Sequence, residues 1–273
     1  MRTAILLNGA VSKVTGKFDN PGQVYRDGDY INYKAIFNSI NTHIIKPNDG
    51  IFDFYIHCWN FDLESKLVDI YKPKKYLFED NNLYKQEILS KLRKCNATDN
   101  KFALCSRSLS IKKVVDLLSN DSSYDYVILY RPDIMLWKDI ILNKYNPNIL
   151  TVNSRNVMTN YSGDFHYISN IENIKKFSLR YDLDTPPSGW SVYSHENTSR
   201  WMKFIRDTMQ VDIDMDDIEA GIDQAPIRYI NTESISLSAI KQGYITISQL
   251  LEYGFSEEEI NSYNVIWGGV EPQ

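Results

Sequence analysis

The clearest strand signal in the chain is YDYVILYRPDIML, residues 124–136. Its central run, residues 126–130, is short, apolar and rich in aromatic and β-branched side chains, which is typical of a strand buried on both faces. Arg131-Pro132-Asp133 follows at once and interrupts the apolar run. The sequence therefore predicts a central strand that places an arginine and a carboxylate at its carboxyl end.

Shorter apolar runs on both sides of this strand alternate with segments of helical periodicity. Strands are expected at residues 4–7, 51–59, 75–78, 149–152 and 165–168, and helices near 36–44, 67–71, 84–92, 110–118, 171–177 and 199–209. This alternation predicts an α/β fold with a mostly parallel central sheet flanked by helices. We expect one domain over residues 1–230, with a polar loop at 12–29, and a helical C-terminal extension over 231–273 that packs on the same domain.

Composition excludes several classes of protein. The 273 residues include 30 Lys plus Arg against 35 Asp plus Glu, a formal net charge of -5, so nucleic acid is not expected as a partner. Cys58, Cys95 and Cys105 make no disulfide framework and indicate a reducing, cytoplasmic location. No stretch approaches the ~20 apolar residues of a membrane span. No transmembrane segment is therefore expected, and peripheral membrane contact stays open.

The carboxyl ends of the predicted strands are where a parallel sheet binds its ligands. Asn8-Gly9 ends the first strand, but no glycine-rich dinucleotide or phosphate loop follows. Arg131 and Asp133 suit a nucleotide diphosphate, the arginine directly and the aspartate through a divalent metal. The alternative interpretation is a local ion pair in a turn closed by Pro132.

Three other polar motifs need an interpretation. Ser106-Arg107-Ser108 is expected at the start of the helix over 110–118, where it suits a phosphate or ribose, or else caps the helix beside a solvated arginine. His57 and His166 lie in apolar runs and are interpreted as hydrogen-bonded core or rim histidines. VDIDMDD, residues 211–217, is interpreted as a solvated acidic turn because it lacks the spacing of a calcium loop.

Six segments in fixed order carry a resemblance to a known family. ILLNGA (5–10), FDFYIHCWNFD (52–62), PKKYLFED (73–80), SRSLSIKKVVDLL (106–118), YDYVILYRPDIML (124–136) and DFHYISN (164–170) together resemble GT-A-like glycosyltransferases. These are enzymes of bacterial capsule and surface-polysaccharide loci and of large algal viruses. The resemblance covers residues 4–180 and implies a GT-A-like, Rossmann-like fold.

The resemblance also implies a reaction, a cofactor and a set of site residues. A sugar would pass from a nucleotide-sugar donor to a surface-glycan acceptor, with Mn²⁺ or Mg²⁺ at an Asp-X-Asp motif. Here the motif reads Arg131-Pro132-Asp133, which keeps only its second acidic residue. Gly221-Ile222-Asp223-Gln224 resembles the Asp-Gln element of several retaining enzymes. The expected roles are nucleoside contacts from Asn8, Gly9 and Arg107, diphosphate contacts from Arg131 and Asp133, metal binding by Asp133, and a base among Asp164, Glu196 and Asp223.

Two rival functions remain open from the sequence. A nucleotidyltransferase would use a similar sheet and a metal-bound aspartate, although it would usually carry a glycine-rich loop after the first strand. A catalytically degenerate member of the fold would serve as a glycan-binding or scaffold module. Release of nucleoside diphosphate from a nucleotide sugar separates the glycosyltransferase from both.

Overall fold

The computed structural model describes residues 1–11, 32–94, 97, 101–118, 123–156, 161–183, 194–219, 224–226, 245–257 and 260. The chain divides into two compact units, each assembled from three stretches of sequence. Unit 1 comprises Met1–Ala10, Asn48–Pro132 and Ile141–Ala220, and unit 2 comprises Val11–Pro47, Asp133–Ile140 and Gly221–Gln273. The predicted loop over 12–29 and the predicted boundary between 230 and 231 both lie outside the described residues.

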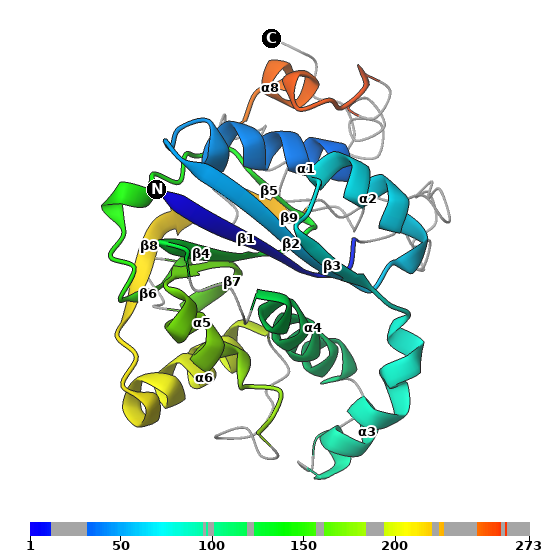
Figure 1. Ribbon diagram of the computed structural model, residues 1–273, viewed down its shortest axis with the longest axis vertical. Coiled ribbons are helices and arrows are strands. Elements are labelled where there is room, and N and C mark those ends of the chain that lie inside the picture. Colours follow the sequence, from blue (N-terminus) through cyan, green and yellow to red (C-terminus); the bar gives the residue numbers. More distant parts are fainter. Residues whose placement is uncertain are drawn as a thin grey trace. The chain divides into compact units, whose positions relative to one another are not determined.

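Unit 1 is built on a seven-stranded sheet with the order β3-β2-β1-β4-β7-β6-β8 (Figure 1). Of these strands, only β7 runs antiparallel to its neighbours, β4 and β6. The expected α/β fold with a mostly parallel sheet is therefore confirmed. The strands are β1 (Arg2–Gly9), β2 (Ile51–Cys58), β3 (Lys75–Phe78), β4 (Tyr126–Tyr130), β6 (Leu150–Asn156), β7 (Tyr161–Ser169) and β8 (Ile213–Glu219).

Helices cover both faces of this sheet, which explains why the middle of β1 and the whole of β4 are apolar. On one face α4 (Phe102–Leu118), α5 (Ile171–Ser178) and α6 (Ser194–Met209) share a buried core with β1, β4 and β7. On the other, α2 (Glu64–Tyr71) packs Tyr71 edge-on against Phe54 of β2, with ring centroids 5.2 Å apart. The other helical elements among the described residues of unit 1 are η2 (Phe61–Leu63), η3 (Asn81–Tyr84), α3 (Lys85–Lys94) and η5 (Leu142–Lys144).

Helix α4 begins earlier than the sequence predicts. It starts at Phe102, so Ser106, Arg107 and Ser108 lie within the helix and not at its N-terminus. The Ser108 hydroxyl donates to the carbonyl of Leu104 at 3.0 Å, the i−4 bond that lets a serine sit inside a helix. The expected phosphate site at a helix N-terminus is therefore wrong, because the backbone there is helical.

The acidic segment over 211–217 is not a solvated turn. It forms most of β8, which runs parallel to β6. Asp216 is buried, where His166 Nε2 lies 3.0 Å from its carboxylate and the Tyr145 hydroxyl also donates to it. These partners offset the cost of burying one charge of the acidic run. His166 is thus a hydrogen-bonded core histidine, as interpreted from the sequence.

Unit 2 contains the expected helix near residues 36–44. It forms as α1 (Tyr33–Ile40) and continues as the π-helical turn η1 (Asn41–Ile45). The His43 ring connects Asp139, at 2.7 Å, with the hydroxyl of Tyr253. The unit also holds α8 (Ile247–Glu252) and a two-stranded sheet that the sequence did not predict, β5 (Ile134–Leu136) with β9 (Gln224–Pro226).

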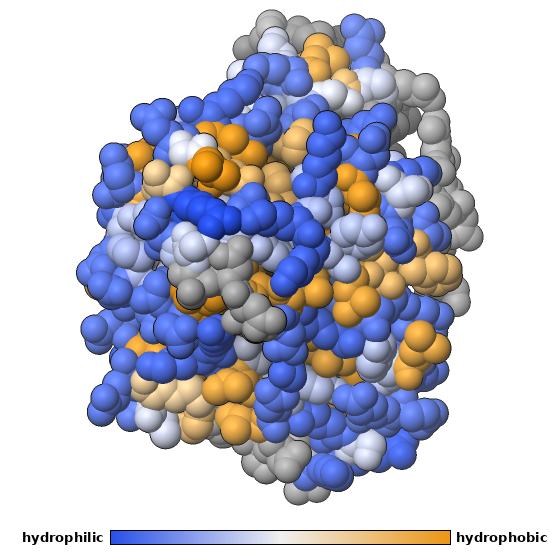
Figure 2. Space-filling view, in the orientation of Figure 1, coloured by the Kyte–Doolittle hydropathy of each residue, from blue (hydrophilic) through white to orange (hydrophobic). Residues whose placement is uncertain are grey.

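Hydrophilic residues cover most of the face of the molecule seen in Figure 2, and hydrophobic residues lie between them in small patches. Within the described ranges, no helix is both long enough and apolar enough to cross a membrane.

Candidate functional site

The centre of the unit 1 sheet has the strand order of a nucleotide-binding fold at its switch point. β1 lies between β2 and β4, and the order 3-2-1-4 is that of doubly wound sheets, which bind ligands beyond the carboxyl ends of the two strands where the order reverses. β1 ends in Asn8-Gly9 and β4 ends in Tyr130, followed by Arg131. The Asn8 side chain donates to the carbonyl of Tyr130 at 3.0 Å, so the two strand ends are joined.

Asp164 lies at this edge and is paired with two arginines. Its Oδ2 atom is 2.5 Å from Arg107 Nη1 and 3.3 Å from Arg131 Nη1. Arg107 also donates to the carbonyl of Asp164. The register explains this meeting, because His166 of β7 pairs with Tyr130 and the antiparallel β7 therefore carries Asp164 beyond the end of β4. All three side chains are largely buried.

A third arginine adds to the positive charge. Arg180, just after α5, interacts electrostatically with Arg107 and Asp164. Burial and the Arg107 charge lower the pKa of Arg180, Tyr167 and Asp164 oppose them, and the net pKa of about 10 leaves the guanidinium charged at neutral pH. We call Arg107, Arg131, Arg180 and Asp164 the arginine cluster. Three of these four side chains are cations in a partly dehydrated place, a setting that suits a polyanionic ligand.

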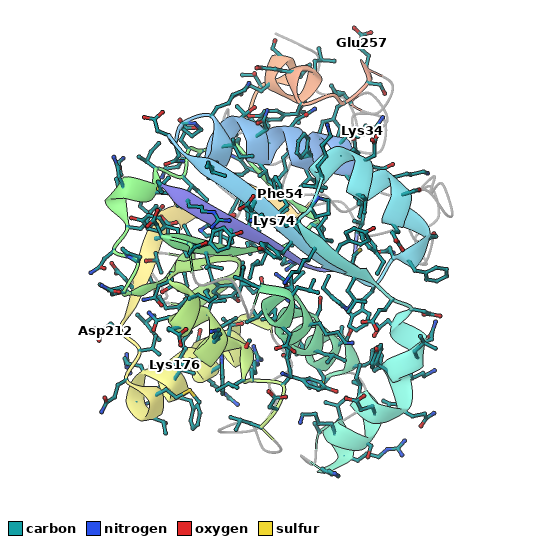
Figure 3. All side chains as sticks on the ribbon, viewed as in Figure 1. Lys34, Phe54, Lys74, Lys176, Asp212 and Glu257 are labelled. Atoms are coloured by element: carbon teal, nitrogen blue, oxygen red, sulfur yellow. The ribbon has the colours of Figure 1, made fainter. Side chains whose placement is uncertain are left out.

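A different charge cluster occupies the opposite, amino edge of the sheet, where Figure 3 labels Lys74. Lys74 and Arg2 lie 3.0 and 3.3 Å from the Asp53 carboxylate, and Tyr124 donates to it at 2.8 Å. Burial raises the pKa of Asp53, but the hydrogen bonds from Tyr124 and Lys74 outweigh it and lower the pKa below its ordinary value. The Lys74 and Arg2 side chains are 39% and 32% exposed. Those of Arg107 and Arg131 are only 18% and 11% exposed, so water screens the charges of Lys74 and Arg2 more strongly.

Gly9 is held by a hydrogen-bond relay. Its N–H donates to the Ser110 hydroxyl at 2.7 Å, Ser110 Oγ lies 2.6 Å from His57 Nδ1, and His57 Nε2 lies 3.1 Å from Glu79. Burial lowers the pKa of His57 to about 4, although the Glu79 carboxylate acts to raise it. The ring is therefore neutral at neutral pH. We assign the ring proton to Nε2, which then donates to Glu79 and leaves Nδ1 to accept from Ser110.

This relay contains the residue types of a serine-nucleophile triad but cannot act as one. Ser110 and His57 are fully buried. Ser110 is hydrogen-bonded to Nδ1 of the His57 ring, whereas in a catalytic triad the serine bonds Nε2 and the acid bonds Nδ1. At its far end Glu79 binds Lys113 at 2.8 Å and accepts from Tyr84. Burial raises the pKa of Glu79, but these hydrogen bonds outweigh it and keep the carboxylate charged. The relay therefore fixes the position of Gly9, where φ is +113° and space beside the Cα is open.

The relay predicts how stability depends on pH. The pKa of His57 is about 4 in the folded protein against 6.5 ordinarily, so between pH 6.5 and 4 the unfolded chain binds a proton that the folded chain does not. The free energy of unfolding should therefore fall by about 2–3 kcal/mol between pH 7 and pH 4.5. Carboxylates with lowered pKa, such as Glu79, add to the loss only at lower pH. Denaturant unfolding of His57→Gln should show a flat profile over this window, and an unchanged slope would contradict the assignment.

Three buried polar atoms near the same edge make no hydrogen bond within the described part of the chain. They are Oδ1 of Asn8, an acceptor on a residue only 2% exposed, Nε1 of Trp59, a donor on the residue that follows β2, and Nε of Arg107. Leaving such atoms unpaired costs about 1–3 kcal/mol each. Asn8 and Arg107 are therefore the residues from which a ligand would gain most by supplying partners.

The structure brings five of the predicted site residues together in unit 1: Asn8, Gly9, Arg107, Arg131 and Asp164. Asp133 is buried and belongs to unit 2. Glu196 lies in the first turn of α6, and its side chain is not among those described. Asp223 lies outside the described residues.

Metal binding has little support from the donor set. Among the described residues, no three His, Cys, Asp or Glu side chains gather as a metal site. Asp133 by itself is a poor fit for the divalent cation that the resemblance implies, since Mg²⁺ sites normally combine one or two carboxylates with substrate phosphates. The cation therefore stays a prediction.

Sequence reasoning missed Arg180 and the partners of Asp164. Arg180 follows a helix with no motif around it, and the meeting of Arg107 with Asp164 joins residues 57 positions apart. Only the reversal of β7 beside β4 brings them together, and no local pattern carries that information. No protein-family model matches the chain, and a search of curated proteins finds no match either.

Proposed function

We propose that this protein is a nucleotide-sugar-dependent glycosyltransferase with a GT-A-like fold that adds a sugar to a surface glycan. The observation that carries the proposal is the arginine cluster at the carboxyl edge of the sheet, beside the β1/β4 switch point. A nucleotide sugar presents a diphosphate to the protein, and guanidinium groups are the side chains best suited to bind phosphate oxygens in pairs.

In this proposal the arginine cluster holds the diphosphate. Negative charge builds up on the nucleoside diphosphate as it leaves the sugar, and fixed cations in a partly dehydrated site stabilise that charge. Arg131 is well placed for this, since its guanidinium lies over the Phe165 ring at 5.5 Å and is braced by Asp164. Arg107 and Arg180 supply the further positive charge.

The nucleoside would lie over the ends of β1 and β2. Among the described residues, Gly9 leaves open space there, and the Asn8 carboxamide oxygen is an acceptor without a partner. Such an oxygen suits a ribose hydroxyl or a nucleobase N–H. The relay through Ser110 and His57 keeps the Gly9 backbone in place for this contact.

The base that deprotonates the acceptor remains among Asp164, Glu196 and Asp223. Two guanidinium groups lie beside Asp164, and a carboxylate paired in this way is a weak proton acceptor. Donor binding would change that, because phosphate oxygens would compete for the same guanidinium groups. An Asp164 base would therefore become effective only when the donor is bound.

Two measurements test the proposal. UDP, GDP, CDP or TDP should raise the melting temperature with rising concentration, since a ligand that binds only the folded state stabilises it. The matching nucleotide sugar should slowly release nucleoside diphosphate. If none of the four shifts the melting temperature, with or without Mn²⁺, the donor site is wrong. Inhibition by EDTA would show that the predicted cation is needed.

A further inference from the structure

A groove in unit 1 lies between the start of α2 and the edge strand β3. It has a volume of about 320 Å³, near the lower end of the range for small-molecule sites. One wall comes from the turn η2 and the first turns of α2, and the other from Tyr76 of β3. The lining residues are Phe61, Asp62, Glu64, Ser65, Val68 and Tyr76.

Two exposed aromatic side chains line this groove. Phe61 is 58% exposed and Tyr76 is 44% exposed, and they are the two aromatic residues among the exposed large hydrophobic side chains of the described part. Both lie in the same groove, although they are 15 positions apart in sequence. The Tyr76 ring packs edge-on against Phe78, with centroids 5.9 Å apart. Exposed apolar surface gathered in one hollow is typical of a binding site.

We propose that this groove binds a neutral glycan, as the subsite for the acceptor chain. The C–H face of a pyranose ring is apolar and packs on aromatic rings such as Phe61 and Tyr76. Sugar hydroxyls donate to carboxylates, and Asp62, Glu64 and Ser65 supply oxygen atoms at the same place. The assignment to the acceptor rests on the proposed glycosyltransferase function.

The groove lies on the same sheet edge as the arginine cluster. Phe61 follows the carboxyl end of β2 by three residues, and β2 stands next to β1 in the sheet. Strands are spaced by about 4.8 Å, so β3 is about 14 Å from β4, which ends at Arg131. A short oligosaccharide spans such a distance. The groove would therefore hold sugars distant from the one that receives the transferred residue.

A cationic peptide is the competing occupant, because aromatic rings and carboxylates also bind ammonium and guanidinium groups. The proposed function favours the glycan, and titration decides between them. Neutral gluco-, galacto- and manno-oligosaccharides and a lysine-rich peptide would be titrated into the native protein, Phe61→Ala, Tyr76→Ala and the control Leu83→Ala. Leu83 is 76% exposed and does not line the groove.

At least one oligosaccharide should bind the native protein and Leu83→Ala equally, and bind Phe61→Ala and Tyr76→Ala about ten-fold more weakly. Phe61→Tyr, which keeps the ring, should bind normally. The inference is overturned if no oligosaccharide binds, if the alanine variants bind as well as the native protein, or if only the peptide binds. Pyrophosphate binding, measured on the same proteins, reports on the arginine cluster and separates failure of the groove from failure of the proposed function.

Discussion

Arg107→Ala should bind inorganic pyrophosphate or a nucleoside diphosphate about 10- to 150-fold more weakly than the native protein. The range corresponds to the ~1.5–3 kcal/mol typical of a hydrogen bond to a charged group. Arg131→Ala should lose a similar amount, since both guanidinium groups meet the same Asp164 oxygen and would meet the same ligand. Calorimetric titration with pyrophosphate makes the measurement independent of the unknown nucleoside.

Matched variants separate ligand binding from general damage. Arg107→Lys keeps the charge but loses the fork of donors that binds two oxygens at once, so it should recover only part of the affinity. Arg206→Ala is the surface control, because Arg206 is 57% exposed and, among the described residues of unit 1, forms an ion pair only with Asp207. Thermal melts would show that each variant folds. If Arg107→Ala binds pyrophosphate normally, the ion pair between Arg107 and Asp164 has only a structural role.

The sequence predicted best the elements whose burial decides their structure. β1 and β4 were found because residues such as Ile5 and Ile128 are apolar and fully buried. β8 was missed because its run of acidic residues is typical of an exposed turn. One of them, Asp216, is buried beside His166, a partner 50 residues away in the sequence. The start of α4 was missed because Ser108 and Ser110 were interpreted as residues that cap its N-terminus, whereas both are buried within the helix.

The candidate site divides in the same way. Arg131 was found from its place at a strand end, which the sequence shows directly. The joining of Arg107 and Arg131 through Asp164 depends on the reversed β7, and Arg180 depends on where α5 ends. Long-range pairing of this kind is set by packing and leaves no local signal, so the residues were predictable one by one but their shared cluster was not.

Asp164→Asn should bind pyrophosphate several-fold to about ten-fold more tightly than the native protein. The Asp164 carboxylate neutralises part of the arginine cluster and would compete with phosphate for Arg107 and Arg131. Asparagine keeps the shape and one acceptor oxygen but removes the charge. Two opposite unit charges about 4 Å apart attract each other by about 4 kcal/mol at an effective dielectric constant of 20. The retained hydrogen bond, and the desolvation of a phosphate that enters the site, reduce the expected gain to about 1 kcal/mol.

Turnover of the same variant then decides the role of Asp164. If Asp164 is the base, Asp164→Asn should bind donor more tightly yet transfer sugar at least ~10²-fold more slowly, as loss of a general base typically does. Tighter binding with normal kcat would leave Glu196 or Asp223 as the base. Weaker pyrophosphate binding would contradict the prediction, because it would mean that Asp164 mainly holds the arginines in position. Asp164→Ala removes the hydrogen bond as well as the charge, so comparing it with Asp164→Asn separates the two effects. If Asp164 positions the arginines, Asp164→Ala should bind pyrophosphate much more weakly than Asp164→Asn.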